Sequence, residues 1–256
     1  MNTRILVATH KEYPMPKDDI YFPIQVGSRY APRLECAAAT DSEGNNISEK
    51  NKTFCELTAV YWAWKNTNYD YLGLCHFRRY FKGKKGIASS EEIESWLKND
   101  VPMILPKARN YYIESNYNQY IHAHHENDLF ITKKVISELF PEYIASWEKV
   151  MKLTKGHRYN MFIMKRELLS AYCEWLFSIL FEVEKRLDIT EYDDYNLRVF
   201  GFIGERLLDI WIDKNMIPYK ERPVYKTEKE NVLMKGALFV VRFIKGRYRD
   251  YKKGSQ

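Results

Sequence analysis

The sequence is poor in cysteine, and its cysteines are widely spaced. The four cysteines, at positions 36, 55, 75 and 173, include no C-x₂-C pair of the kind found in zinc and redox sites. They are also too few for the dense disulfide framework of a small secreted protein. We therefore expect a reduced protein in the cytoplasm.

Long apolar runs are absent as well. No stretch of ~20 consecutive apolar residues exists, so the sequence predicts no helix that spans a bilayer. The N-terminus lacks the long apolar stretch and the cleavage site of a secretory signal peptide, which again favours the cytoplasm.

A strong charge of one sign is missing from most of the chain. The net charge is +6, but seven Lys or Arg lie between Lys235 and Lys253, against one acid, Asp250. The remaining body is close to neutral, so we expect no nucleic-acid-binding face. Hydrophobic residues make up 45% of the chain and charged residues 29%, which predicts a folded domain with a large core rather than a disordered chain.

The most informative stretch runs from Tyr69 to Phe81, where an apolar run ends in polar side chains. The apolar part has the composition of a strand buried on both faces of a parallel sheet. His76, Arg78 and Arg79 follow at its carboxyl end, where open α/β sheets bind their ligands. Two adjacent guanidinium groups suit a phosphate or a carboxylate. The alternative is a solvated turn with a structural histidine.

Further apolar runs predict more buried strands, separated by helices. The first run, Arg4 to Thr9, ends in Thr9 and His10, which are candidate ligand-binding residues because the first strand of a doubly wound fold commonly ends at the ligand; an ordinary strand-to-loop transition is the alternative. The other strands are predicted at residues 21–26, 103–106 and 161–164, and helices at 53–66, 89–98, 132–139, 143–153, 167–187 and 196–214. This alternation predicts an α/β fold, a mostly parallel sheet flanked by helices.

The helix predicted over residues 53–66 has a marked start. Thr53-x-x-Glu56 has the form of a capping box. Glu49 and Asn51 lie on the approach to this helix, where free backbone N–H groups favour an anion, so both are candidate ligand-binding residues. Helix capping alone also explains them.

The stretch from Tyr111 to His125 is the least regular part of the chain. It contains three histidines within four positions, His122, His124 and His125, with acidic residues just beyond. Their H-x-H-H order lacks the i, i+4 spacing of a helical zinc motif, and no cysteine is nearby. We therefore favour a loop rich in tyrosine and histidine that lines a polar substrate pocket over a metal cluster.

The C-terminal segment, residues 232–251, mixes apolar residues with lysine and arginine. This composition predicts a basic amphipathic helix, and such helices lie on anionic membrane surfaces. The alternative is a terminal helix docked on the body. We accordingly divide the chain into an α/β domain, residues 1–225, and a basic tail, residues 226–256.

Seven blocks in a fixed order resemble one known family. They are Ile5–Lys11 with Pro14-Met-Pro16, Ile24–Gly27, Asn46–Asn51, Glu56–Lys65, Leu72–Phe81, Gly156-His157 with Asn160–Met164, and Arg198–Leu208. Over about residues 4–215 the chain thereby resembles the DUF4422 proteins of bacterial capsular and exopolysaccharide biosynthesis. The resemblance implies a GT-A-like glycosyltransferase that moves a sugar, galactofuranose in some members, from a UDP-sugar to a lipid-linked oligosaccharide. Such an enzyme would lie at the inner face of the cell membrane, and the candidate ligand-binding residues would bind its donor.

One motif departs from this resemblance. GT-A enzymes usually end the central strand in an Asp-x-Asp motif that holds a divalent metal against the donor diphosphate, whereas Cys75-His-Phe-Arg-Arg79 stands here. Arg78 and Arg79 would then neutralise the diphosphate directly. Alternatively, His76 is one ligand of a Mn²⁺ or Mg²⁺ ion whose carboxylate ligand comes from elsewhere in the chain.

An inverting transfer of a sugar also requires a carboxylate or an imidazole that takes the proton of the acceptor hydroxyl. Glu205 is a candidate because it lies in a block shared with the family, and Asp128 is another because it follows the histidines. The other candidates in the sequence are His125, Asp193 and Asp194. The residues predicted to bind the acceptor are Asn160, His157 and Tyr120.

Two other functions remain open from the sequence. In the first, His76 acts as nucleophile or acid in a phosphate-handling transferase or hydrolase, with Arg78 and Arg79 as the anion clamp. In the second, the chain is a non-catalytic assembly subunit of a polysaccharide machine, tethered by its basic tail.

Overall fold

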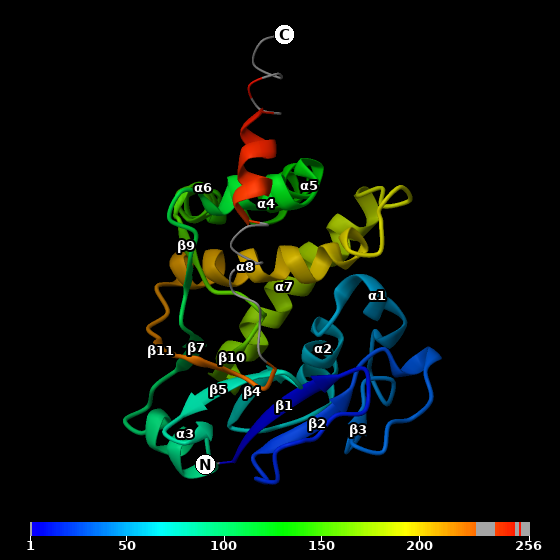
Figure 1. Cartoon of the computed structure of the whole chain (residues 1–256), viewed down its shortest axis with the longest axis vertical. Helices are drawn as coiled ribbons and strands as arrows, with labels where there is room; N and C mark the ends of the chain where they lie inside the picture. Colours follow the sequence, from blue (N-terminus) through cyan, green and yellow to red (C-terminus); the bar gives the residue numbers. More distant parts are fainter. Residues whose placement is uncertain (1, 229–238, 249–250, 252–256) are drawn as a thin grey trace.

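The protein is built around one large sheet with helices packed against it. The computed structural model describes residues 2–228, 239–248 and 251. The sheet lies in the lower half of Figure 1 and most helices lie above it. Its strands are β1 (Thr3–Thr9), β2 (Tyr21–Gln25), β3 (Ala39–Thr40), β4 (Tyr71–His76), β5 (Arg79–Gly83), β6 (Gly86–Ile87), β7 (Met103–Pro106), β10 (Phe162–Lys165), β11 (Lys220–Arg222) and β12 (Val224–Lys226). A separate two-stranded ladder joins β8 (Arg109–Asn110) to β9 (Lys155–Gly156).

The sheet is mostly parallel, as the alternation of strands and helices predicted. Its main path runs β11-β7-β10-β4-β1-β2-β3. Strands β4, β1, β2 and β3 pair in parallel, whereas β10 is antiparallel to both of its neighbours, β4 and β7. At the end of the path β11 pairs in parallel with β7.

Burial on both faces explains why the central strands read as continuous apolar runs. In β1, Leu6 and Ala8 join the core cluster on one face, and Ile5 and Val7 join the cluster on the other face. Successive side chains of a strand point to opposite faces of the sheet. When both faces are covered, every position is buried, and the sequence shows a continuous apolar run instead of alternating apolar and polar residues.

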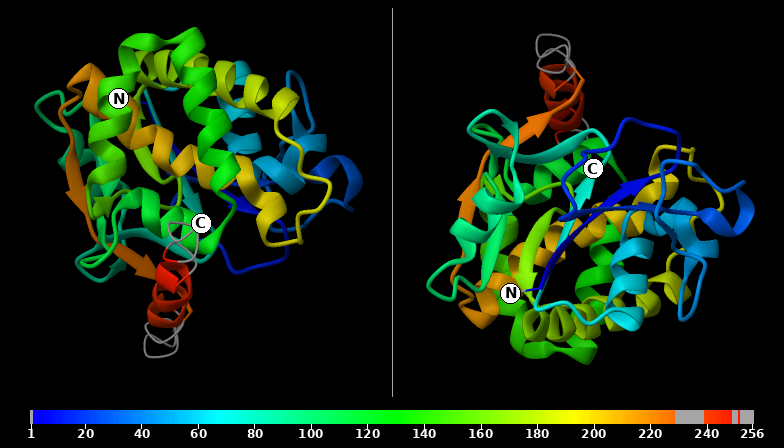
Figure 2. Two further views of the ribbon diagram at one scale, coloured as in Figure 1. Left: turned by 90° about the horizontal axis from the view of Figure 1, so that it is seen from above. Right: turned by 90° about the horizontal axis from the view of Figure 1, so that it is seen from below.

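Helices cover the two faces unequally. The helices are α1 (Asn51–Phe54), α2 (Leu57–Asn66), α3 (Ser90–Leu97), α4 (Asn116–Ala123), α5 (Glu126–Leu139), α6 (Ile144–Lys152), α7 (Arg166–Arg186) and α8 (Val199–Asn215). The larger core cluster contains residues of α2, α5, α6, α7 and α8, and the smaller one contains residues of α3. Figure 2 shows the bulk of the helices on one side of the sheet.

The predicted helix over residues 53–66 is in fact two helices, and its predicted capping box is wrong. Cys55 has a positive φ of 53°, which L-residues rarely adopt, and this turn of the backbone ends α1 before α2 begins. Neither helix has a side-chain cap. A capping box does occur at the predicted start of α3, where Ser89 and Glu92 each bond the other's backbone N–H.

The stretch from Tyr111 to His125 is not a loop throughout, because residues 116–123 form α4. The Oγ atom of Ser115 caps this helix by accepting the N–H of Asn118 at 3.1 Å. Tyr120 and Ile121 anchor it in the core, with exposed fractions of 0% and 7%. The many polar residues of this short helix hid its apolar face in the sequence.

Part of the predicted C-terminal helix falls within the described residues. Residues 239–248 are helical, whereas the prediction for residues 232–238 lies outside the described part of the chain. The boundary predicted at residue 225 falls within β12, which pairs with β5. Among the described residues, no helix combines the length and apolar character that crossing a bilayer requires.

A buried carboxylate holds together the loops beside β1 and β2. Asp41 is fully buried and accepts the backbone N–H groups of Gly27 and Ser28 at 2.8 and 3.1 Å. It also accepts the hydroxyl groups of Ser28, Ser48 and Thr58 at 2.9, 2.5 and 2.6 Å. These bonds join the end of β2 to the start of α2.

Replacing Asp41 should therefore destabilise the fold strongly. In an Asp41→Ala variant, five donors lose this acceptor, two of them in buried bonds and three in partly buried ones, and we expect a loss of about 3 kcal/mol or more in the free energy of unfolding. Urea unfolding followed by tryptophan fluorescence measures this loss. The exposed Glu35→Ala substitution is the control and should change stability by less than about 0.5 kcal/mol. Equal stability of the two variants would contradict the role of Asp41.

Candidate functional site

A cleft of about 660 Å³ opens at the carboxyl ends of β1 and β4. The two strands are in register, with Ala8 beside His76, so both end at the same edge of the sheet. The cleft is lined from β1 by Ala8 and His10, from the turn after β4 by Phe77 and Arg78, and from the opposite side by side chains of α4 and α8. Figure 1 shows the strands below and these helices above. The position is the one predicted for the ligand.

The cleft is rich in positive charge. Its cationic lining residues are Arg78, Arg79, Arg109, Arg158, Arg198, Arg206 and Lys52, and its acids are Glu56, Asp194 and Glu205. Partial desolvation, and then the charges of Arg78 and Lys11, lower the pKa of His10. His10 is therefore neutral at pH 7, and the cleft favours an anionic ligand.

The arginines belong to two groups with different surroundings. Arg158 and Arg206 are buried, with exposed fractions of 4% and 3%. Arg158 donates to the hydroxyl of Tyr111 at 3.0 Å, and Arg206 donates to the carboxylate of Glu205 at 2.9 Å and the side-chain oxygen of Gln119 at 2.6 Å. These contacts compensate the two buried charges, so this group forms part of the scaffold.

Arg78 and Arg79 lie at the turn between β4 and β5, nearer to solvent. The Nη1 atom of Arg78 is 3.2 Å from the carboxylate of Glu228, and both side chains are over 40% exposed. The guanidinium of Arg79 lies 4.7 Å from the ring centre of Tyr159. Exposed ion pairs are weak, so an anion with several oxygens can compete with Glu228 for Arg78.

His76 ends β4 in the cleft, where it faces the backbone of another loop. Its Nε2 atom lies 2.6 Å from the carbonyl oxygen of Tyr159. A carbonyl oxygen only accepts, so Nε2 carries the proton and is not available as a metal ligand. Across residues 2–228, 239–248 and 251, no three His, Cys, Asp or Glu side chains come together as metal ligands. The described donors therefore do not fit the Mn²⁺ or Mg²⁺ site considered above.

Glu205 is held firmly in the cleft wall. Its Oε1 atom accepts the backbone N–H of Tyr159 at 2.8 Å, and its Oε2 atom accepts from Arg206 at 2.9 Å. Arg158 lies at 4.0 Å from the same Oε2 atom. Both carboxylate oxygens are thus occupied by donors.

A second carboxylate in the cleft, Glu56, was missed as a catalytic candidate. It lies between α1 and α2, and its Oε1 atom accepts the Nδ2 group of Asn160 at 2.7 Å. Its Oε2 atom makes no hydrogen bond within the described part of the chain. The sequence analysis named Glu56 only as the last residue of the predicted capping box. Because the helix is interrupted at Cys55, the side chain of Glu56 lies in the cleft instead.

Asn160 is buried and supports this arrangement. It is 2% exposed, and its Nδ2 group also donates to the carbonyl oxygen of Gly201 at 3.1 Å. Tyr159 and Asn160 both adopt left-handed backbone conformations, with φ of 76° and 51°. This sharp turn before β10 brings Asn160 to Glu56. Its predicted contact with the acceptor stays a prediction.

Of the predicted donor-binding residues, five line the cleft and two do not. The five are His10, Asn51, His76, Arg78 and Arg79. Thr9 is fully buried, and its hydroxyl donates to the carbonyl oxygen of Lys11 at 2.7 Å. Glu49 is exposed in a short 3-10 turn, Ser48–Lys50. Glu49 is close to Asn51 in the sequence, but only Asn51 lines the cleft.

Tyr120, His125 and Asp128 belong to a neighbouring cluster rather than to the cleft lining. Asp128 is 1% exposed and accepts the hydroxyls of Tyr120 at 2.8 Å and Tyr192 at 2.5 Å. Burial raises the pKa of Asp128, although the two tyrosine hydroxyls oppose this shift. His125 stacks on the ring of Tyr192 at 4.1 Å. Their predicted roles as base and acceptor ligand stay untested.

The three histidines of the H-x-H-H stretch point to different partners. His122 pairs with the buried carboxylate of Glu114. His124 lines the cleft, where burial and then the charge of Arg206 lower its pKa to about 3. With His125 on Tyr192, the three imidazoles do not form a metal cluster within the described residues.

His157, the third predicted acceptor ligand, is buried beneath the cleft instead of lining it. Its Nδ1 atom lies 2.5 Å from Oδ1 of Asp209, and its Nε2 atom 3.0 Å from Oε1 of Glu221. Burial alone would lower the pKa of His157, but Asp209 and then Glu221 overcome this effect and raise it. The imidazolium thus links α8 to β11.

The contacts of His157 with Asp209 and Glu221 predict that the stability of the protein depends on pH. A histidine whose pKa is raised by folding stabilises fully below its unfolded value of 6.5, and the contribution disappears as pH rises through the folded pKa. We expect His157→Gln to lose about 3 kcal/mol relative to wild type at pH 6, and the gap to narrow as pH rises.

Urea unfolding of both proteins from about pH 6 to about pH 9, a range that spans the titration of histidine, measures this gap in the free energy of unfolding. The exposed His125→Gln variant is the control and should follow the wild-type profile. A gap that stays constant or widens with rising pH would show that His157 is not charged in the folded protein.

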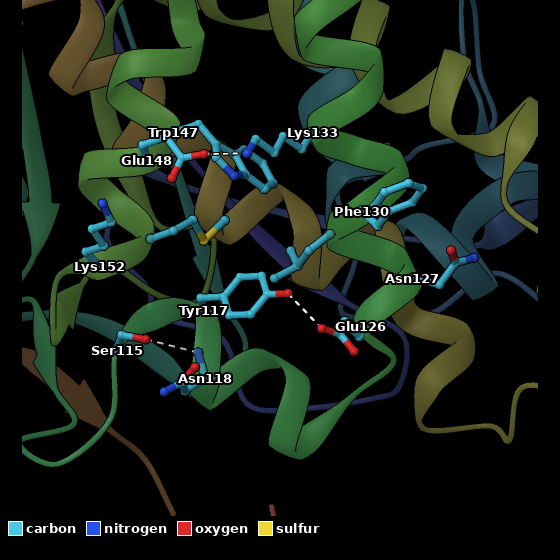
Figure 3. Close-up of a pocket in the computed structure, with 12 residues that line it drawn as sticks. Ser115, Tyr117, Asn118, Glu126, Asn127, Phe130, Lys133, Trp147, Glu148 and Lys152 are labelled. Carbon is cyan, nitrogen blue, oxygen red and sulfur yellow. Dashed lines mark hydrogen bonds and ion pairs between the residues drawn. The ribbon is translucent and has the colours of Figure 1, made fainter. Parts of the chain in front are cut away.

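A second cavity of about 770 Å³ lies between α4, α5 and α6 (Figure 3). Three of its charged side chains have described partners: Lys133 pairs with Glu148, and Oε1 of Glu126 accepts the hydroxyl of Tyr117 at 2.9 Å. Among the described residues, its lining holds neither arginine nor histidine. We therefore place the functional site in the cationic cleft at the edge of the sheet and not in this cavity.

The fold and the cleft together define an α/β protein with a mostly parallel sheet and a cationic cleft at its carboxyl edge. The chain matches the family described as "Domain of unknown function (DUF4422)" over residues 4–216, and it belongs to that family. No curated protein matches it.

Among solved structures, the chain is similar to the apo structure of WbbM, described as a bifunctional glycosyltransferase. The TM-score is 0.80 and the sequence identity 27%, over 89% of this chain. The match covers 46% of the WbbM chain, so this chain spans about half the length of that protein. Membership of DUF4422 and the GT-A-like arrangement of sheet and helices, both predicted from the sequence, are confirmed.

Proposed function

We propose that the protein is a glycosyltransferase of polysaccharide synthesis that uses a UDP-sugar as donor. The observation that carries this proposal is the cationic cleft at the carboxyl edge of the sheet, in a chain similar to a bifunctional glycosyltransferase. The finer assignments rest on the family resemblance. They are galactofuranose as the sugar, a lipid-linked oligosaccharide as acceptor, a role in capsule or exopolysaccharide synthesis, and a peripheral position at the inner face of the cell membrane.

The donor diphosphate is assigned to the turn after β4. Arg78 and Arg79 supply adjacent guanidinium groups, and Arg198 lines the same cleft from the start of α8. His10 and Asn51 line the β1–β2 side of the cleft. In this proposal the nucleoside of the donor binds on that side, next to the diphosphate. Guanidinium groups bind phosphate oxygens through paired hydrogen bonds, which fixes the donor as well as neutralising it.

The reaction breaks the bond between the anomeric carbon and the diphosphate oxygen. The acceptor oxygen forms a new bond to that carbon, its proton passes to a base, and the diphosphate leaves with the bonding electrons. Negative charge therefore grows on the leaving group, and fixed cations at that place lower the barrier. Arg78, Arg79 and Arg198 perform this role, and no step depends on a metal ion.

Glu56 fits the role of base better than Glu205 does. The base must offer an oxygen that accepts a proton from the acceptor. Both oxygens of Glu205 are held by donors, two of them arginines, so Glu205 instead orients Arg206 and the Tyr159 backbone. Glu56 has one oxygen fixed by Asn160, which leaves the other directed to a substrate.

Covalent phosphohistidine chemistry has less support. The Nε2 atom of His76 is bound to the Tyr159 carbonyl, which removes one of the two ring nitrogens as a nucleophile. The one thiol in the cleft is also unsuited, because burial raises the pKa of Cys55 to about 12 and keeps it protonated.

The donor assignment predicts the effect of removing the arginines. Each of Arg78→Ala and Arg79→Ala removes charge-assisted hydrogen bonds to the diphosphate, and we expect UDP affinity to fall about 10- to 100-fold. Calorimetric titration with UDP measures the change, and Lys82→Ala, an exposed cation on β5, is the control. We also expect wild-type binding to be the same with and without Mn²⁺.

Two results would contradict this assignment. Binding that requires Mn²⁺ would point to a metal site built from residues other than those described. Failure of the wild-type protein to bind UDP or any other nucleotide would favour a non-catalytic assembly subunit.

The assignment of the base makes a separate prediction. Glu56→Gln keeps the shape of the side chain and its bond to Asn160 but removes the basic oxygen. We expect kcat to fall by at least about 100-fold, with UDP affinity unchanged, because general-base catalysis contributes roughly 10²- to 10⁴-fold.

Steady-state transfer assays and UDP titration separate the two effects, and Glu94→Gln on the exposed face of α3 is the control. If Glu205→Gln lowers kcat more than Glu56→Gln does, the roles of the two carboxylates are the reverse of those proposed.

A further inference from the structure

The described C-terminal helix, residues 239–248, is seated at the rim of the cleft. The ring of Phe239 stacks on that of Tyr111, with centres 6.1 Å apart and planes at 22°. The guanidinium of Arg242 lies 5.8 Å from the ring centre of Tyr195. Tyr111 and Tyr195 both line the cleft, so the helix touches its rim at two points.

A third contact fixes which face of the helix packs inward. Gly246 is buried against α4, and a Cβ atom at this position would come within 2.2 Å of the ring of His122. Positions 239, 242 and 246 recur at helical spacing, so they mark one face. The opposite face points away from the body, and Figure 1 shows the helix extending beyond α4.

That outer face is apolar and basic. Val240, Val241 and Ile244 are 47%, 46% and 60% exposed. Lys245 and Arg247 are exposed beside them, and residues 239–248 contain no acid. An apolar stripe flanked by cations is the pattern of a helix that lies in a membrane interface.

A loop next to the helix adds to the same surface. Tyr112 and Ile113, directly after Tyr111, are 82% and 57% exposed. Tyr112 has a left-handed backbone with φ of 57°, and its N–H donates to the side chain of Asn110 at 2.9 Å, so the loop is held in this shape. Arg109, also exposed, lies 5.1 Å from the ring centre of Tyr111.

We propose that these two segments form one surface, here called the rim surface, which binds the headgroup region of an anionic phospholipid bilayer. It consists of Tyr112 and Ile113 together with the outer face of residues 239–248. Its apolar side chains insert among the lipids, and Arg109, Lys245 and Arg247 contact lipid phosphates. The excess of cations disfavours a second copy of the chain as the occupant, because like charges would meet.

This inference rests on the proposed function and makes it more specific. A lipid-linked acceptor stays in the membrane, and its sugar end must reach the cleft. Because the inner face of the same helix packs on Tyr111 and Tyr195, membrane binding through its outer face would place the mouth of the cleft at the bilayer, where the acceptor is concentrated. The predicted basic tail alone would tether the chain without orienting the cleft.

Vesicle sedimentation of the full chain tests the proposal. We expect binding to vesicles that mix phosphatidylglycerol with phosphatidylcholine, little binding to phosphatidylcholine alone, and weaker binding as salt is raised. The double variants Val241→Ser/Ile244→Ser and Tyr112→Ser/Ile113→Ser should each lose at least about tenfold in binding. Tyr30→Ser, an equally polar change at a residue 82% exposed beyond β2, is the control and should bind like wild type.

UDP titration of the same variants separates this proposal from the proposed function. We expect both double variants to bind UDP and to unfold like wild type. Wild-type vesicle binding without UDP binding would overturn the proposed function and leave the rim surface standing. Equal vesicle binding by the wild type and both variants would overturn the rim surface. A soluble wild-type dimer that the variants convert to monomer would also overturn it, in favour of a second copy of the chain.

Discussion

The parallel pairing of β1 with β4 is the constraint on which the site depends. The register places Val7 beside Cys75 and Ala8 beside His76, so both strands end at one level. The chain after each strand then enters the same cleft. Both strands are buried on both faces, and a shift of one residue would move every side chain to the opposite face. The core therefore fixes the position of the polar residues that follow.

The charges of the cleft divide into a scaffold and a ligand-binding group. Arg158 and Arg206 are buried with carboxylates and amides around them, because a buried charge without partners is costly. Arg78 and Arg79 lie on a turn nearer to solvent, where Arg78 pairs with the exposed Glu228. The first group keeps Glu205 and the wall of the cleft in place. The second group is where an anionic ligand gains most on binding.

The C-terminal part of the chain returns to the cleft from both sides. Strand β12 pairs with β5, which brings Glu228 to Arg78, and the helix of residues 239–248 packs on Tyr111 and Tyr195. The second cavity lies on the other side of α4, which supplies Gln119 to the cleft and Tyr117 to that cavity. Helix α4 thus separates two spaces of different chemistry, one lined by six arginines and the other by none among the described residues.

The α/β class, the central strand and the cluster of His76, Arg78 and Arg79 at its end could be predicted before folding was considered, because apolar periodicity and the polar residues that interrupt it are local signals. The sequence did not reveal that Glu56 meets Asn160, since 104 residues separate them and the positive φ of Cys55 turns the chain so that the carboxylate points inward. Nor did it reveal the buried partners of His157 and Asp128, which come from α8, α4 and residues near 192. Which polar residue faces the cleft and which is buried beside it was decided only when distant segments packed together.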